Sequence, residues 1–84
     1  MEHISYKTHG VCARQIDMEV ENGVIVSAAF TGGCSGNTQG VAALVAGMSI
    51  EDAIKRLRGI KCGFKSTSCP DQLAIALEEY LANK

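Results

Sequence analysis

The chain has 84 residues, of which 46% are hydrophobic, and its eight basic and nine acidic residues leave a formal net charge of −1. This length accommodates one small domain over residues 1–84, and the apolar content is typical of a globular protein. The near-zero charge argues against a nucleic-acid partner. No apolar stretch is long enough to cross a bilayer and no secretory signal pattern is visible, so we expect a cytoplasmic protein with no membrane partner.

The N-terminal third of the sequence predicts β-strands. Residues 4–8 alternate roughly between apolar and polar side chains, and the segment after them alternates more clearly. Asn22-Gly23 is the pair that type I′ turns prefer, and β-branched residues follow it. We therefore predict a small antiparallel sheet, formed by a hairpin over about 12–30 and an N-terminal strand.

The remainder of the sequence predicts three helices. Apolar residues recur at helical spacing within 41–48, and the segment 49–52 resembles a capping box that begins a second short helix. Residues 59–68 read as an irregular loop, and Pro70 stands at a first-turn position of a final helix. Strands followed by helices indicate an α+β fold, with the three helices packed on one face of the sheet.

Four cysteines are a high density for a cytosolic chain of this length, where such residues are more often metal ligands or reactive thiols than disulfides. In the predicted hairpin residue i pairs near residue 45 − i, which places Cys12 beside Cys34. Cys34 and Cys69 each precede a predicted helix, whose N-terminal N–H groups favour a thiolate. Cys69 is free to converge on the same end, and Cys62 lies in the adjoining loop.

Four thiolates at tetrahedral positions suit Zn²⁺ or an iron–sulfur cluster. We therefore predict a metal site with the ligands Cys12, Cys34, Cys62 and Cys69. The basic segment 55–58 is interpreted as a solvated helix face rather than a phosphate site. Because the sequence offers neither a paired-carboxylate arrangement nor a phosphate-binding loop, we do not expect an enzyme.

The pentapeptide Thr67-Ser-Cys-Pro-Asp71 resembles the signature of the TSCPD domain family. The segments 32–37, 47–49 and 59–63 are similar to that family's other motifs, so the resemblance covers most of the chain. Members occur as short proteins and at the C-terminus of cobalamin-dependent ribonucleotide reductases. The resemblance implies a role accessory to that reductase, since 84 residues leave no room for its catalytic barrel.

The layout also resembles the iron–sulfur scaffold family of IscU and the NifU N-terminal domain. Cys12, Cys34 and Cys69 match that family's three cysteine positions in turn. The resemblance implies an IscU-like α+β fold whose tip binds Zn²⁺ or assembles a [2Fe–2S] cluster. It also implies a protein client and a sulfur donor as partners.

Three positions depart from the scaffold pattern. Arg14 stands where the scaffolds have an aspartate that keeps the cluster labile, and Ser68 stands where they often have a histidine. Cys62 is an additional thiol that would close a four-cysteine site, and a closed site favours a structural or storage role.

Three functions are therefore open at the level of sequence. The first is a small cytoplasmic metal-binding module with Zn²⁺ as its cofactor. The second is an iron–sulfur scaffold or carrier with a [2Fe–2S] cluster. The third is a thiol redox module in which Cys62 and Cys69 form a reversible disulfide.

Overall fold

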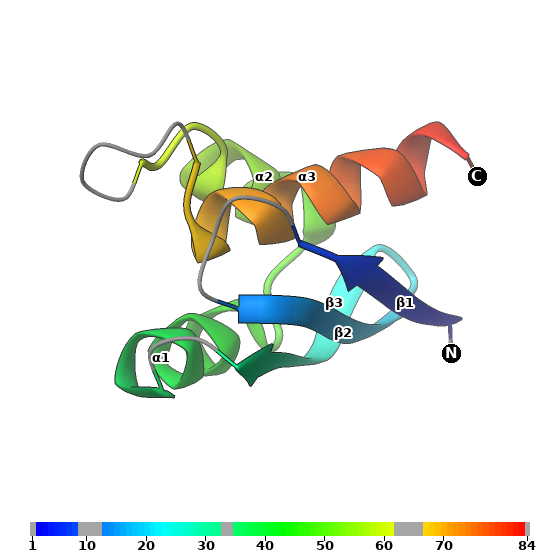
Figure 1. The fold of residues 1–84 in the computed structure, drawn as a ribbon. Coiled ribbons are helices and arrows are strands. Elements are labelled where there is room, and N and C mark those ends of the chain that lie inside the picture. The colour runs from blue at the N-terminus through cyan, green and yellow to red at the C-terminus, as the bar shows by residue number, and fades with distance from the viewer. Residues whose placement is uncertain (1, 9–12, 33–34, 62–66, 84) are drawn as a thin grey trace.

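The structure, a computed structural model, describes residues 2–8, 13–32, 35–61 and 67–83, with the backbone alone for 35–37. It confirms the α+β fold: a three-stranded antiparallel sheet in the order β1-β2-β3 is combined with three helices (Figure 1). The elements are β1 (Glu2–Lys7), β2 (Ala13–Glu21), β3 (Val24–Gly32), α1 (Ser35–Val45), α2 (Ile50–Leu57) and α3 (Cys69–Ala82).

The predicted hairpin is confirmed, with its turn at the expected residues. Asn22 and Gly23 both have left-handed backbone angles, φ 54° and 77°, which a type I′ turn requires at its two central positions. The expected pairing holds next to the turn and again at Ala13 with Gly32, but irregularities shift it by one residue between these points. Met18, for example, pairs with Ala28.

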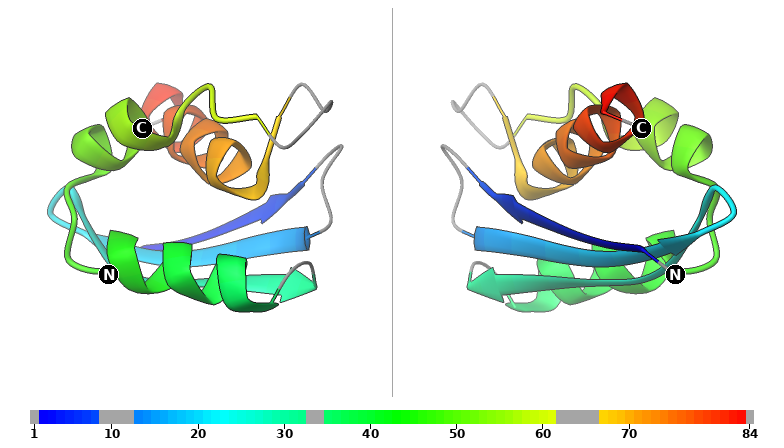
Figure 2. Two further views of the ribbon diagram at one scale, coloured as in Figure 1. Left: turned by 90° about the vertical axis from the view of Figure 1, so that its left-hand side faces the viewer. Right: turned by 90° about the vertical axis from the view of Figure 1, so that its right-hand side faces the viewer.

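One core lies between one face of the sheet and the helices. Ile16, Met18 and Val20 of β2 alternate toward this face and are fully buried there. They pack in a single cluster with residues from all three helices, among them Val45, Ile50, Ala53, Leu73 and Leu77. Helices α2 and α3 lie above the sheet, whereas α1 runs along the β3 side (Figures 1 and 2).

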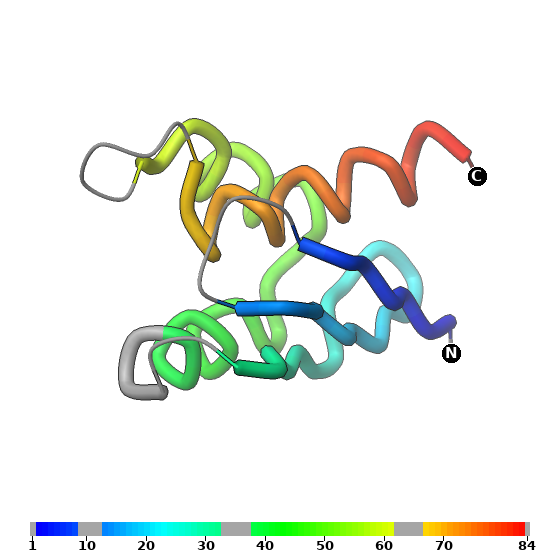
Figure 3. Tube along the Cα trace, viewed as in Figure 1, coloured from blue at the N-terminus to red at the C-terminus, as the bar shows by residue number. Residues whose placement is uncertain are grey.

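The linker between α1 and α2 covers the start of β3. Gly47 donates its N–H to the Ile25 carbonyl at 2.7 Å, and Ile25 donates to the Met48 carbonyl at 2.9 Å. The N–H of Ile50 reaches the Gly23 carbonyl at 2.9 Å. Figure 3 shows this linker beside the first part of β3. These bonds give that edge of the sheet backbone partners that it would otherwise lack.

Helices α2 and α3 begin at serine caps, as capping preferences predict. The Ser49 hydroxyl accepts the Asp52 N–H at 3.1 Å, and the Ser68 hydroxyl accepts the Asp71 N–H at 3.2 Å. Among the described residues, none of the helices combines the length and apolar character needed to span a membrane.

We expect Leu73→Ala to lower the free energy of unfolding by about 2–5 kcal/mol, because the side chain is fully buried and its loss leaves a cavity. Leu44→Ala is the matched control, since Leu44 is 74% exposed, and should change stability by no more than about 0.5 kcal/mol. Urea denaturation of both variants measures the difference. Equal effects would contradict the assignment of the core.

Candidate functional site

Cys69 is the first residue of α3, as predicted, and its thiol is free. Only 8% of the residue is exposed. The preceding Ser68 has extended backbone angles, φ −148° and ψ 170°, so the helix begins sharply at the cysteine. Its hydroxyl also donates to the Ile60 carbonyl at 2.7 Å. The Ser68 hydroxyl therefore bonds both the Asp71 N–H and the Ile60 carbonyl, and these two bonds fix the first turn of the helix that carries Cys69.

Asp71, two residues further along, is a buried carboxylate with three donors. Its Oδ2 accepts the Thr67 hydroxyl at 2.5 Å, and its Oδ1 accepts the Gly59 N–H at 2.6 Å. The Oδ1 also lies 3.0 Å from the Arg58 Nη1, with 3% of the aspartate side chain exposed. We call this set of four residues the Asp71 clamp. A buried charge needs such partners, because an unpaired one is costly.

The clamp joins two segments of the chain that precede and follow residues 62–66, which lie outside the described part. Gly59 and Ile60 lie before these residues, whereas Thr67 and Ser68 lie after them. The two sides are bonded to each other through the Asp71 carboxylate and the Ser68 hydroxyl. Together these bonds fix the start of α3 against the chain that leaves α2.

The Arg58 guanidinium contacts two carboxylates, those of Asp71 and Glu78. Arg58 donates its Nε to Glu78 at 2.9 Å while its Nη1 contacts Asp71, and these contacts raise the pKa of the guanidinium. Burial pushes the pKa of the Asp71 carboxyl upward, but hydrogen bonds from Thr67, Gly59 and Arg58 outweigh it. The net effect lowers the pKa of Asp71, so the carboxylate form is the one that the clamp stabilises.

The four predicted metal ligands are not all described by the structure. Cys12, Cys34 and Cys62 lie outside the described residues, so their convergence with Cys69 stays a prediction. In the part of the chain that the structure does describe, no group of three or more histidine, cysteine or acidic side chains is arranged to hold a metal ion. The start of β2, the end of β3 and the starts of α1 and α3 do lie toward the same end of the molecule (Figures 1 and 2).

The Asp71 clamp was not predicted from the sequence. Arg58 was interpreted as part of a solvated face, and it is 48% exposed, yet it bonds both Asp71 and Glu78. The one sequence signal was an acidic residue three positions after a serine cap, which favours a helix N-terminus. That signal says nothing of Gly59 or Arg58, because both are brought to Asp71 by the packing of α2 against α3.

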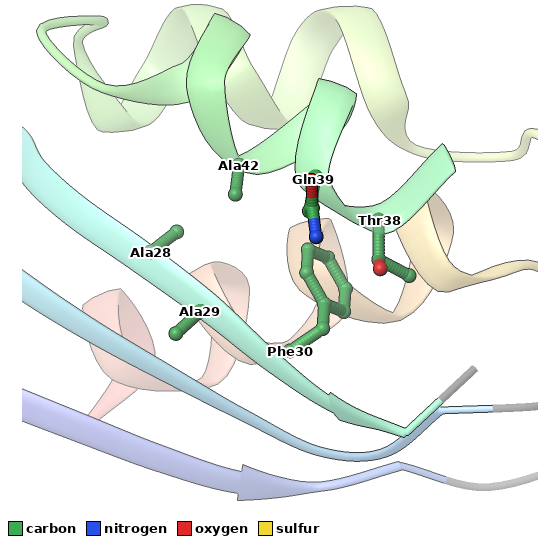
Figure 4. A pocket seen from close by; sticks show the side chains of 6 residues that line it. All are labelled: Ala28, Ala29, Phe30, Thr38, Gln39 and Ala42. Carbon is green, nitrogen blue, oxygen red and sulfur yellow. The ribbon is translucent and has the colours of Figure 1, made fainter. Parts of the chain in front are cut away.

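A groove of about 250 Å³ lies away from these residues, between β3 and α1. Figure 4 shows the ring of Phe30 turned toward α1 across it. The described residues that line it are Ala28, Ala29, Phe30, Thr38, Gln39 and Ala42. None of these six side chains is charged or a thiol, so the groove adds no metal ligand to the candidate site.

The sequence model of the TSCPD domain matches residues 2–81, which is nearly the whole chain. The chain therefore belongs to the TSCPD domain family. Neither a curated protein nor a solved structure matches it significantly, so the likeness to IscU stays a prediction. The family signature coincides with Thr67, the cap Ser68, Cys69 and the clamp residue Asp71, and thus with the start of α3.

We expect Asp71→Asn to destabilise the fold by about 1–3 kcal/mol, because the amide carries donors where Thr67 and Arg58 also donate. Glu78→Gln removes only the exposed partner of Arg58 and should cost no more than about 1 kcal/mol. Chemical denaturation at neutral pH compares the two. A larger loss in Glu78→Gln would mean that Arg58, rather than the carboxylate, holds the segments together.

The contribution of Asp71 to the free energy of unfolding should depend on pH. Because its pKa is lowered in the folded state, its contribution is complete above the unfolded pKa of about 3.9 and is lost as the pH falls through the lower folded pKa. The stability difference between the wild type and Asp71→Asn should therefore be constant above about pH 5 and shrink as the pH falls below about 4. A difference that stays constant below about pH 4 would show that the carboxylate charge is not what the clamp uses.

Proposed function

We propose that this TSCPD-domain protein is a small metal-binding module that holds one Zn²⁺ through Cys12, Cys34, Cys62 and Cys69. The observation that carries the proposal is the position of Cys69, a free thiol at the start of a capped helix. The helix N-terminus favours a negatively charged group there, and a thiolate is the form that binds zinc.

Residues next to the other cysteines in the sequence support convergence. Ala13 follows Cys12 and pairs with Gly32, and Ser35 follows Cys34 as the first residue of α1. These neighbours and the start of α3 belong to the same end of the fold (Figure 2). Connectivity limits how far each cysteine can lie from its described neighbour, because adjacent Cα atoms are about 3.8 Å apart.

The clamp supports the inclusion of Cys62. This cysteine follows Lys61 in the sequence, and Gly59 and Ile60, which precede it, are bonded to Asp71 and Ser68 at the start of α3. Only Lys61 separates Cys62 from these bonded residues, so chain connectivity limits its distance from the start of α3. Zn²⁺ with four thiolate ligands has no open coordination position, so it acts as a structural crosslink. The metal would then stabilise a domain whose core is small.

The setting of this module is proposed from its family. Short TSCPD proteins and reductase C-termini share the domain, so we propose a cytoplasmic role accessory to ribonucleotide reductase rather than catalysis by this chain. The module would place a rigid, metal-crosslinked surface against a protein client. An iron–sulfur carrier and a thiol redox module are the alternatives that the next experiment separates.

Elemental analysis with thiol counting on protein purified anaerobically and without chelator tests the proposal. We expect about one zinc per chain and four thiols that react only after the metal is removed. Iron with matching labile sulfide would overturn the zinc assignment in favour of a cluster carrier that needs a sulfur donor. Four freely titrating thiols without metal would exclude both metal functions.

Single Cys→Ser variants identify the ligands. Each of the four substitutions should reduce zinc content and lower the thermal midpoint, and chelation should lower the wild-type midpoint toward the variants' value. Leu44→Ala, at an exposed site, should retain full zinc content and serves as the control. A Cys62→Ser variant with unchanged zinc content would show that only the other three cysteines bind.

A further inference from the structure

The outer edge of β1 is the most regular unpaired strand edge among the described residues. β1 pairs with β2 along its full length without a bulge, and it forms one border of the sheet (Figure 1). The opposite border, formed by β3, is partly covered, because the α1–α2 linker bonds its start and α1 runs beside it. A regular edge strand is a template for pairing with another strand.

The backbone groups that point outward from β1 follow from one hydrogen bond. Thr8 donates its N–H to the Arg14 carbonyl of β2 at 3.2 Å. Backbone directions alternate along an antiparallel strand, so Tyr6, Ile4 and Glu2 also face β2. The residues whose N–H and C=O point away from the sheet are therefore His3, Ser5 and Lys7.

We propose that two copies of this chain join by antiparallel pairing of their β1 strands, with Ser5 on the two-fold axis. In an antiparallel pair with a two-fold axis perpendicular to the sheet, outward-pointing residues of one copy pair with outward-pointing residues of the other. With Ser5 opposite Ser5, His3 of one copy therefore lies opposite Lys7 of the second copy. This register pairs every outward-pointing residue of β1, whereas a shift by one pair leaves either His3 or Lys7 without a partner within the strand. The result is a continuous sheet that doubles the three strands of each copy.

Charge complementarity supports this register. On the exposed face of the sheet, His3 Nε2 lies 3.3 Å from Asp17 Oδ1, and His3 Nδ1 lies 3.8 Å from Glu19 Oε1. Lys7 of the second copy arrives opposite His3, on the same face of the sheet as these two carboxylates and across His3 from Glu19. Each copy thus provides the carboxylates of Asp17 and Glu19 and receives Lys7 of the other copy. The two-fold symmetry repeats this charge contact on both sides of the axis.

The core face of the sheet offers apolar surface at the same border. Ile4 and Tyr6 are only half-buried, and the proposed register places each opposite the other. Helix α3 lies above β1, where the Tyr80 hydroxyl donates to Glu2 at 2.7 Å, and its neighbour Leu81 is 40% exposed. Strand pairing alone buries little area, so these side chains would supply the apolar contact that a stable interface needs.

Sedimentation equilibrium of the metal-loaded wild type and two variants tests the proposal. The wild type should have twice the mass of the chain, and Ser5→Pro should be monomeric, because proline removes an outward N–H and places its ring in the interface. Ser5→Thr is the control, since it keeps the N–H and a hydroxyl, and should remain dimeric. A monomeric wild type at high micromolar concentration, or a dimer unaffected by Ser5→Pro, would overturn the proposal; the latter would indicate another interface or metal bridging.

A charge exchange keeps the test valid if Ser5→Pro fails to fold. Lys7→Glu should weaken dimerisation at least tenfold at low salt by placing a carboxylate beside Asp17 and Glu19 of the second copy. The double variant Lys7→Glu/Glu19→Lys should recover most of this loss. Unchanged dimerisation in Lys7→Glu, or no recovery in the double variant, would contradict the proposed register.

Discussion

The carboxylate of Asp71 is the interaction on which the candidate site depends. A buried charge must be compensated, and its donors come from the end of α2, from the residue after it and from the threonine before α3. The fold can satisfy Asp71 only by bringing the chain that leaves α2 back to the start of α3. The donors that bond the two carboxylate oxygens of Asp71 thereby fix the position of the segment that carries Cys69.

This dependence gives each residue of the family signature a physical role. Thr67 donates to the carboxylate, and Ser68 caps the helix and bonds the Ile60 carbonyl. Pro70 stands in the first turn, where a missing N–H costs nothing. The side chain of Cys69 takes no part in the hydrogen bonds described here, so Thr67, Ser68 and Asp71 form a frame around a free thiol. This frame is the basis on which we propose that Cys69 is a metal ligand.

Much of the fold could be predicted from local sequence signals. The hairpin follows from Asn22-Gly23 and the alternation around it, and the starts of α2 and α3 follow from Ser49 and Pro70. The irregular pairing near Glu19 and the linker bonds to β3 were not predictable, because they arise when separate elements pack together. The clamp escaped prediction for the same reason. Arg58 and Gly59 are separated from Thr67 and Asp71 by residues 60–66, and no local spacing pattern links the two pairs.

We propose that a cysteine cluster at the start of α3 holds zinc. Zinc K-edge X-ray absorption on protein purified without chelator tests this most directly, since it reports the ligand atoms around the metal. We predict about four sulfur ligands at roughly 2.3 Å from the zinc. A shell of oxygen and nitrogen ligands, with no sulfur at that distance, would contradict the account.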